Sequence, residues 1–179
     1  MDEKPIISII MGSTSDLPLM KKAMDVLEAL GISFDVQFLS AHRTPGALRG
    51  YISFAKGLGV RVFITGAGMS NALSGTVKAW AKNTPVIGVP LSGTPVESVA
   101  AVLATLEMPP GVVVATVALD GAQNAGILAV EMLALSDEKL DEELSTYKVT
   151  EQKKKDEKAV TALTNLKLEF KFFKSLNYY

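Results

Sequence analysis

Residues 40–45, Ser-Ala-His-Arg-Thr-Pro, contain the two side chains best suited to proton transfer on an anionic ligand. His42 is the only histidine of the chain, and Arg43 follows it directly. A histidine side chain titrates nearer to neutral pH than the other common side chains, so that it can both take and return a proton. An arginine guanidinium can hold a phosphate through a forked pair of donors. The pair therefore indicates a titratable group beside an anion-binding group.

The place of this hexamer in the chain supports a ligand site. The alternating apolar run at 33–39 predicts a strand, and Pro45 suits the first position of a following helix. The hexamer would then lie at the carboxyl end of a strand, which is the edge where open α/β sheets bind ligands. A lone histidine is usually a loop side chain satisfied by the backbone. Here its place beside Arg43 and Ser40 at that edge favours a function.

Three other segments rich in Gly and Ser also follow predicted strands. Residues 12–16 offer N–H groups and hydroxyls to a phosphate or a ribose, although a capped turn explains them equally well. The glycines of residues 66–75 let the backbone approach a ligand, or else form a tight turn. Ser92 and Gly93 would form a further part of the rim of the ligand site. The candidate catalytic residue is His42, and the candidate substrate-binding residues are Gly12, Ser13, Ser15, Asp16, Ser40, Ala41, Arg43, Gly66, Ala67, Gly68, Ser70 and Asn71.

The elements that must position these loops alternate along the chain. Apolar runs predict strands at 6–11, 33–39, 60–65, 85–89 and 112–119, and helical spacing predicts helices at 17–30, 46–56, 76–82, 95–106 and 122–135. This order predicts an α/β fold with a parallel sheet between two layers of helices. Right-handed crossovers then bring all the strand-to-helix loops to one edge of the sheet.

Size and composition limit the possible classes of protein. The 179 residues suit one domain, and a net charge of -1 argues against nucleic-acid partners and anionic membranes. The chain has no cysteine and one histidine, which excludes disulfides and a multi-histidine zinc site within one chain. Asp16 is the only carboxylate of the loops named above, so no metal is expected. Neither a secretory signal nor a long apolar span is visible, which predicts a cytoplasmic protein.

The character of the chain changes after residue 136. Residues 137–147 form an acidic, helix-like segment, and residues 151–158 carry mixed charges typical of a solvated helix face. Residues 167–179 contain five aromatic side chains, which is unusual for a disordered tail. We therefore expect a nucleotide-binding catalytic domain at 1–149. A helical extension at 150–179 would pack on the same subunit or on a neighbouring one.

Several motifs together resemble one enzyme family. They are Met-Gly-Ser with Ser-Asp at 11–16, the hexamer at 40–45, Gly-Ala-Gly at 66–68, Pro-Val-Ile-Gly-Val-Pro at 85–90, Met-Pro with Gly at 108–111, and Asn-Ala with Ile-Leu-Ala at 124–129. In this order they resemble the carboxyaminoimidazole ribonucleotide mutases and the related aminoimidazole ribonucleotide carboxylases of purine biosynthesis. The resemblance covers roughly residues 6–135, and the combination of motifs is highly specific.

The resemblance implies a three-layer, flavodoxin-like α/β/α subunit in a homo-octamer, without metal or organic cofactor. It implies that residues 12–16 and 40–43 hold a nucleotide phosphate. In the mutase the carboxylate moves from the exocyclic nitrogen of the imidazole to a ring carbon, with carbon dioxide trapped in between. His42 would then transfer the protons.

The third loop, residues 66–75 after the predicted strand at 60–65, departs from the pattern of bacterial mutases, which carry a second histidine there. This chain has Ala72 at that position, and residues 70–75 look like the carboxylases that use free carbon dioxide. Those carboxylases usually have Lys at the position of Arg43 and Arg at that of Met69. The hexamer and residues 85–90 and 112–119 favour the mutase. Mutase activity is therefore the main hypothesis, with direct carboxylation of aminoimidazole ribonucleotide as the alternative.

Three other classes stay open. A flavin or nucleotide binder of flavodoxin type would explain residues 12–16, although the later loops lack the aromatic side chains that sandwich a flavin. A phosphate-binding regulatory module would make His42 incidental. A related carboxylase for another aromatic ring would use the same scaffold, because a fold does not determine its substrate.

Overall fold

Five parallel strands form the centre of the protein in a computed structural model that describes residues 4–165. The order across the sheet is β2-β1-β3-β4-β5, with strands at Ile7–Met11 (β1), Phe34–Phe38 (β2), Val62–Ala67 (β3), Val86–Pro90 (β4) and Ala115–Thr116 (β5). This is the flavodoxin-like order, in which the strand order reverses between β1 and β3. The predicted parallel α/β sheet is confirmed.

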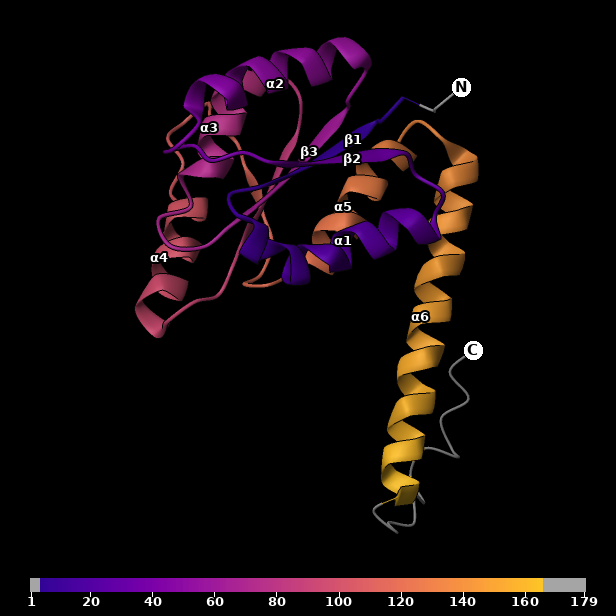
Figure 1. Ribbon diagram of the computed structural model, residues 1–179. Helices are drawn as coiled ribbons and strands as arrows, with labels where there is room; N and C mark the ends of the chain where they lie inside the picture. The colour runs from indigo at the N-terminus through magenta and orange to yellow at the C-terminus, as the bar shows by residue number, and fades with distance from the viewer. Residues whose placement is uncertain (1–3, 166–179) are drawn as a thin grey trace.

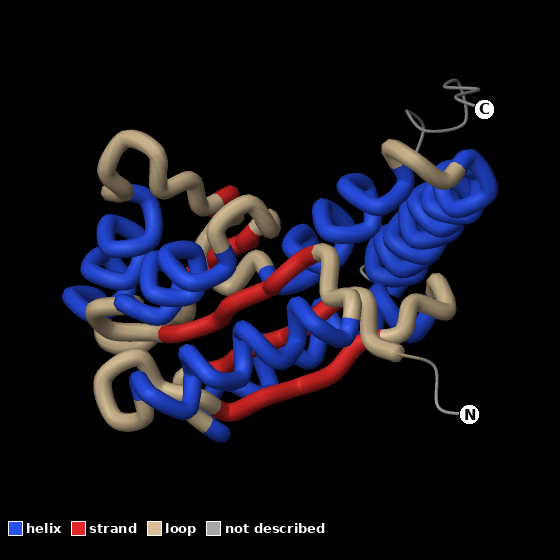
Figure 2. The backbone as a smooth tube through the Cα atoms, turned by 90° about the horizontal axis from the view of Figure 1, so that it is seen from above, coloured by secondary structure: helices blue, strands red, loops and turns tan. Residues whose placement is uncertain are grey.

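Helices cover both faces of this sheet (Figure 1). One layer contains α1 (Leu17–Ala29) and α5 (Ala122–Ala134), and the other contains α2 (Pro45–Leu58), α3 (Ala72–Ala81) and α4 (Pro95–Leu106). A short 3-10 turn, η1 (Thr14–Asp16), precedes α1, and the long helix α6 (Glu138–Asn165) follows α5. The strands run side by side between these layers, and the loops at their carboxyl ends gather at one end of the molecule (Figure 2).

The central strands are buried on both faces, as their continuous apolar sequences predict. Alternate residues of β1 face opposite layers: Ile7 and Ile9 pack with α1 and α5, whereas Ile10 packs with α2 and α3. A strand of this kind cannot shift by one residue without exchanging its two faces. The register between β1 and β3, Ile7 opposite Val62, therefore holds the loops that follow both strands at a common level.

Two elements differ from the sequence prediction. Of the strand predicted at 112–119, only Ala115 and Thr116 form β5, because the Pro-Pro-Gly turn at 109–111 comes directly before the predicted start. Helix α3 begins at Ala72, before Gly75 rather than after it. Gly75 lies within α3, where a Cβ would come within 3.1 Å of the Met108 sulfur, so that glycine leaves room for the Met108 side chain.

Helix α6 leaves the body of the protein after its first turns (Figure 1). Leu140 and Leu144 are buried against the α1–α5 layer, whereas residues 152–160 are all exposed. The domain boundary predicted between 149 and 150 falls inside this continuous helix. The aromatic tail predicted to pack on a subunit lies outside the described residues. Among residues 4–165, no helix is long and apolar enough to cross a membrane.

A buried polar cluster ties the edge strand β2 to α2. The Tyr51 hydroxyl donates to the Asp35 carboxylate and lies 2.6 Å from Ser8 Oγ on β1. The second oxygen of Asp35 is buried without a hydrogen-bond partner within residues 4–165. Burial and the neighbouring Asp35 raise the pKa of Tyr51 above its ordinary value, so that the phenol stays protonated and donates.

Replacing Tyr51 with Phe should lower the free energy of unfolding by about 1–3 kcal/mol, because the partly buried Asp35 would lose the Tyr51 hydroxyl as a donor. Urea denaturation of the variant and the parent measures this change. Tyr147 is not suited as a control because it is partly buried and packs on the core. Thr146→Val, which removes an exposed hydroxyl of α6, is the matched control. Equal stability of Tyr51→Phe and the parent would contradict a stabilising role.

Candidate active site

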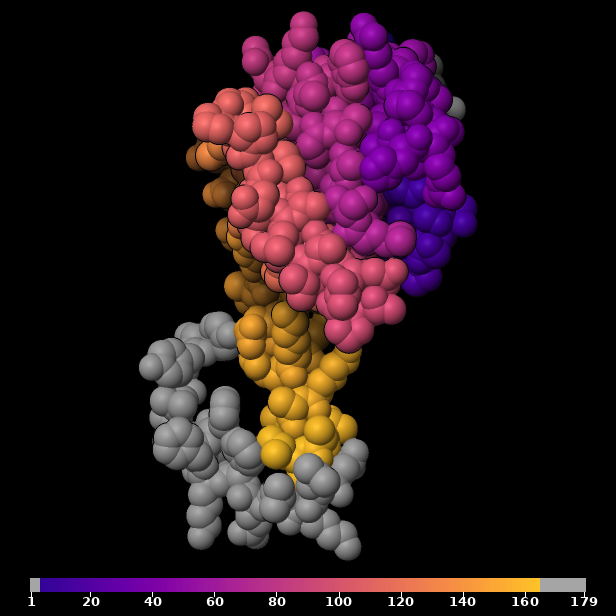
Figure 3. Space-filling view, turned by 90° about the vertical axis from the view of Figure 1, so that its left-hand side faces the viewer, coloured from indigo at the N-terminus to yellow at the C-terminus, as the bar shows by residue number. Residues whose placement is uncertain are grey.

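The predicted loops enclose a cavity of about 620 Å³ at the carboxyl edge of the sheet. Figure 3 views the molecule from the side of this edge, where the N-terminal loops and the segment leading into α4 lie beside each other. A larger groove of about 730 Å³ runs between the end of α1 and α6, but neither His nor Arg lines it. The lining of the smaller cavity consists of Gly12, Ser13, Ser15, Asp16, Ser40, Ala41, His42, Arg43, Ala67, Gly68, Met69, Ser70, Asn71, Ala72, Leu73, Ser92, Gly93 and Glu97.

All of the candidate residues except Gly66 therefore line one cavity. Gly66 is buried in β3, and its role is packing: a Cβ at this position would lie 2.3 Å from the sulfur of Met20 on α1. Its missing side chain lets α1 approach the sheet, whereas Gly68, two residues later, reaches the cavity wall. The sequence alone does not separate these two glycines.

The loop at 40–44 is held by its own side chains. Ser40 Oγ accepts hydrogen bonds from the backbone N–H groups of His42 (3.3 Å) and Arg43 (3.1 Å), and Thr44 Oγ1 accepts one from the Ser40 N–H. These bonds form a compact turn before α2, which begins at Pro45 as predicted. Because these bonds use the backbone N–H groups of His42 and Arg43, the exposed side chains of both residues stay available to a ligand.

Arg43 joins the loops that follow the neighbouring strands β1 and β2. Its Nη2 donates to the Gly12 carbonyl oxygen at 3.0 Å, so that the guanidinium lies over the loop that follows β1. In that loop the Asp16 carboxylate accepts the Ser13 N–H at 2.9 Å, and Ser13 Oγ accepts from Ser15. Burial raises the pKa of Asp16, although the Ser13 N–H and the charge of Arg43 act in the opposite direction.

The third loop, residues 68–71, has a strained backbone. Met69 has a φ of 54° and Asn71 a φ of 28°, values that residues with side chains rarely adopt. The Asn71 side chain points away from the cavity: its Nδ2 donates to Thr105 Oγ1 of α4 at 2.7 Å, and the residue is only 2% exposed. Of the two predicted polar groups, therefore, Ser70 is exposed at the cavity and Asn71 is bonded into the core.

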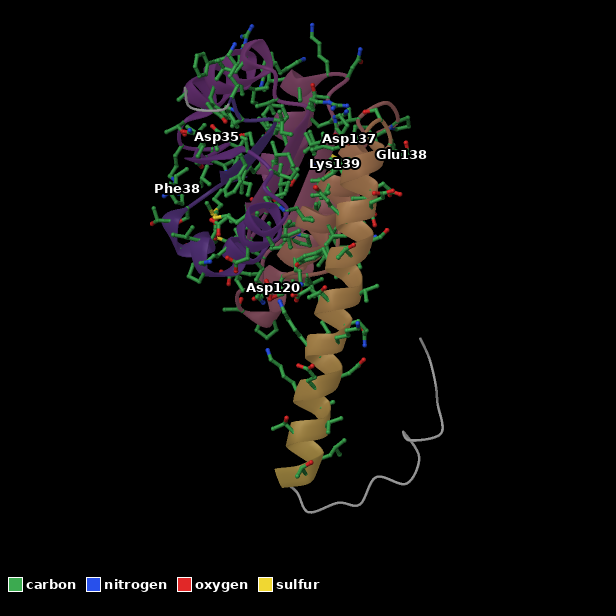
Figure 4. The ribbon with its side chains drawn as sticks, turned by 90° about the vertical axis from the view of Figure 1, so that its right-hand side faces the viewer. Asp35, Phe38, Asp120, Asp137, Glu138 and Lys139 are labelled. Atoms are coloured by element: carbon green, nitrogen blue, oxygen red, sulfur yellow. The ribbon has the colours of Figure 1, made fainter. Side chains whose placement is uncertain are left out.

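Asp120, which was not predicted from the sequence, holds the loop that follows β4. This residue has a φ of 57°, and its carboxylate accepts the Ser92 N–H at 2.8 Å. Its own N–H donates to the Pro90 carbonyl oxygen at 2.9 Å, so that one residue holds both sides of the bend after β4. Figure 4 labels Asp120 at the end of the body opposite to Asp137, where α6 begins. The Asp-Gly pair at 120–121 is a typical turn signal and could have indicated this turn from the sequence.

Several helices begin at this same edge. The N-termini of α2, α3 and α4 follow the cavity loops, and an N-terminus carries partial positive charge together with free N–H groups. Thr94 caps α4 through Glu97, but the N-cap residue of α3, Asn71, makes no capping bond. With Arg43, these helix ends favour a ligand that carries negative charge, such as a phosphate or carboxylate.

Fold and site together define a flavodoxin-like α/β protein with a cavity at the strand-order reversal that contains His42 and Arg43. Comparison with known proteins makes the assignment specific. The sequence model of the AIR carboxylase family matches residues 6–155, and the chain belongs to this family. The family expected from the motifs is thereby confirmed.

Individual relatives carry two enzyme names. The chain is 40% identical over 157 residues to the N5-carboxyaminoimidazole ribonucleotide mutase of Pyrococcus horikoshii, covering 88% of each chain. It is 46% identical to the phosphoribosylaminoimidazole carboxylase of Candida glabrata, but this match covers 74% of the chain and 23% of that protein. The crystal structure of Treponema denticola PurE is similar in fold, with a TM-score of 0.75, 29% identity, and coverage of 91% of this chain and 99% of that one.

Proposed function

We propose that this protein forms carboxyaminoimidazole ribonucleotide in purine biosynthesis by isomerising the N5-carboxylated nucleotide. The observation that carries the proposal is the single cavity in which His42 and Arg43 meet residues 12–16 and 67–70. The archaeal relative that this chain matches over 88% of both lengths bears the name of this mutase. Sequence similarity over the whole catalytic region thus agrees with the chemistry that the cavity residues permit.

The proposed roles follow from where the residues lie. The substrate phosphate binds between residues 12–16 and Arg43, where N–H groups, hydroxyls and a guanidinium converge. The imidazole ring then extends toward His42 and the third loop. Exposed Ser15 and Ser70 offer further hydroxyls to the ribose or the ring. These contacts hold the ring and the migrating group together and replace an encounter from solution.

The reaction moves one carboxyl group and one proton. The bond between the exocyclic nitrogen and the carboxyl carbon breaks, and carbon dioxide is released into the cavity while the nitrogen gains a proton. The ring carbon attacks the carbon dioxide, a carbon–carbon bond forms, and that ring carbon loses its proton. His42 takes the ring proton and supplies one to the nitrogen, a general acid–base role worth about 100- to 10,000-fold in rate. Loops that exclude water keep the carbon dioxide from escaping.

The second candidate is direct carboxylation of aminoimidazole ribonucleotide with free carbon dioxide. The third loop supports it, because residues 70–75 have no histidine and resemble the carboxylases. The match to the Candida glabrata protein with the carboxylase name covers only 23% of that protein, however. Both candidates use the same cavity and give the same product, and the mutase is favoured by its full-length relatives.

A parallel product assay separates the two candidates. The purified chain is incubated with aminoimidazole ribonucleotide and with its N-carboxylated form, each with and without bicarbonate. Turnover of the N-carboxylated form without bicarbonate is the expected result. Turnover of the uncarboxylated nucleotide only with bicarbonate would establish the carboxylase instead. No turnover of either nucleotide would return the cavity to the binding-module or related-carboxylase hypotheses.

We also propose how the protein assembles and where in the cell it acts. The chain is expected to act as a homo-octamer in the cytoplasm, with residues 150–179 packed on the same or a neighbouring subunit. The exposed far half of α6 is available for such a contact. Sedimentation velocity of the full chain and of a chain ending at Val149 tests it. An octamer that the shortened chain also forms, with an unchanged melting temperature, would contradict a contribution of the extension.

A further inference from the structure

A buried hydrogen-bond chain connects the third loop of the cavity to the inner face of α4. The Asn71 amide donates to Thr105 Oγ1 at 2.7 Å, and the Thr105 hydroxyl donates to the Ala101 carbonyl oxygen at 2.6 Å. On the other side, Ser74 Oγ donates to Asn71 Oδ1 at 3.4 Å and lies 2.9 Å from Thr65 Oγ1 of β3. Asn71, Ser74, Thr65 and Thr105 are all buried.

Burial makes this chain of bonds energetically important. A buried amide that loses its partner is costly, and a network of satisfied groups favours one arrangement of the atoms that carry it. Thr105 is fully buried and does not line the cavity. Within residues 4–165, the Thr105 hydroxyl forms hydrogen bonds only with the Asn71 amide and with the Ala101 carbonyl oxygen of its own helix. It is therefore connected to the site only through the third loop.

The backbone of that loop needs an external hold. Among residues 4–165, four residues other than glycine have a positive φ, namely Met69, Asn71, Lys82 and Asp120. Two of them are in the third loop itself, where the remaining backbone bond joins the Asn71 N–H to the Gly68 carbonyl oxygen at 3.1 Å. Residues in sparsely populated backbone regions persist only where surrounding contacts over-determine them.

We propose that Thr105 is a positioning residue that holds residues 68–71 in their active conformation through Asn71, a role that rests on the proposed function of the cavity. The Asn71 amide is engaged with Thr105 and so neither binds the substrate nor caps α3. The hydroxyl of Thr105 therefore sets where Gly68, Met69 and Ser70 lie at the cavity wall. Loss of this hydroxyl lets the loop relax toward ordinary backbone conformations.

Thr105→Val is the main test, because it removes the hydroxyl and keeps the size of the side chain. Thr116→Val is the matched control: the Thr116 hydroxyl donates to the backbone carbonyl of Thr105 at 3.1 Å but does not reach Asn71 or the cavity. Thr105→Val loses two hydrogen bonds of its hydroxyl, to Asn71 and to the Ala101 carbonyl oxygen, whereas Thr116→Val loses one, to the Thr105 carbonyl oxygen. Both should melt a few degrees lower, but only Thr105→Val should change the site.

Hydrogen–deuterium exchange measures the loop without any substrate. Peptides that cover residues 66–73 should exchange at least about threefold faster in Thr105→Val than in the parent, whereas residues 12–16 and the Thr116→Val variant should match the parent. Unchanged exchange at 66–73 in a folded Thr105→Val would overturn the proposal. This measurement stays decisive even if the parent protein turns over neither nucleotide, a result that would refute only the proposed function.

Kinetics on the N-carboxylated nucleotide tests the consequence for the site. Thr105→Val should lower kcat/KM by about 10- to 100-fold, since small misplacements of substrate contacts have effects of this size. Thr105→Ser, which keeps the hydroxyl, should restore most of the activity. Faster loop exchange with unchanged kinetics, or an equal kinetic loss in Thr116→Val, would overturn a positioning role.

A variant on the loop side covers the case in which Thr105→Val does not fold. Asn71→Gly removes the amide, and glycine adopts the φ of 28° without strain, while the Thr105 hydroxyl keeps its bond to Ala101. The same faster exchange at 66–73 is expected in Asn71→Gly. In that background, Thr105→Ser and Thr105→Ala should have equal kcat/KM, because the hydroxyl no longer has a loop partner. A separate loss in Thr105→Ala would contradict the coupling through Asn71.

Discussion

Replacing His42 with Asn is expected to lower kcat by about 100- to 10,000-fold and to leave nucleotide binding nearly unchanged. The structure separates these two effects. The backbone N–H of His42, not its side chain, is bonded to Ser40 Oγ, so the turn at 40–44 survives the substitution. Arg43 and residues 12–16, which hold the phosphate in the proposed mode, are untouched. What is lost is the only imidazole of the chain.

The measurement is single-turnover conversion of the N-carboxylated nucleotide, together with calorimetric titration of aminoimidazole ribonucleotide. Asn keeps a polar group of similar reach but cannot carry a proton at neutral pH. Ser15→Ala is the companion variant, because it removes an exposed hydroxyl from the same cavity without touching proton transfer. It should change kcat only slightly. Full turnover by His42→Asn would remove the acid–base assignment and favour a binding module.

Replacing Arg43 with Ala is expected to weaken nucleotide binding by about 10- to 150-fold. This range is the conversion of about 1.5–3 kcal/mol, which is typical of a hydrogen bond to a charged group. The guanidinium would contact the phosphate while its Nη2 holds the Gly12 carbonyl oxygen, so that both the ligand and the loop after β1 lose a partner. The effect should fall mainly on the dissociation constant and KM rather than on kcat.

Arg49→Ala is the matched control for the change in charge. Arg49 lies on α2, the helix that follows the turn of Arg43, and its guanidinium stacks over the Trp80 ring at 4.3 Å, outside the cavity. Each variant removes one positive charge, but only Arg43 reaches the proposed phosphate position. Arg43→Lys should fall between the parent and Arg43→Ala, since lysine keeps the charge and loses the fork. Equal binding by Arg43→Ala and Arg49→Ala would refute the phosphate role.

The two predictions are independent of which reaction the enzyme prefers. His42 and Arg43 lie in the same turn, and mutase and carboxylase both need a proton carrier and a phosphate anchor. The choice between the reactions depends on the third loop, where no second histidine is present. Thr105 and Asn71 determine the shape of that loop in the structure, so their variants also report on how the loop contributes to either reaction.

Most of the fold could be predicted from the sequence. The spacing of apolar residues along 6–135 gave the order of strands and helices, and Pro45 and Gly59 mark the start and end of α2. These signals are local, because hydrophobic period and backbone-restricted residues act within a few positions. Parallel connection then follows from the alternation of elements, and with it the gathering of the four loops at one edge. The cavity residues were predictable for the same reason.

The role of each predicted site residue depends on tertiary contacts. Gly66 serves packing against Met20 and Gly68 the cavity wall, although both stand in the same Gly-Ala-Gly motif. Asn71 turns toward Thr105, which is 34 positions away in sequence, and Asp120 reaches back to Ser92 across 28 positions. Such contacts depend on how packed elements approach one another, and no local pattern encodes that distance. Local sequence patterns thus indicate which loops meet, whereas the packing of α1 and α4 fixes which of their residues face the cavity.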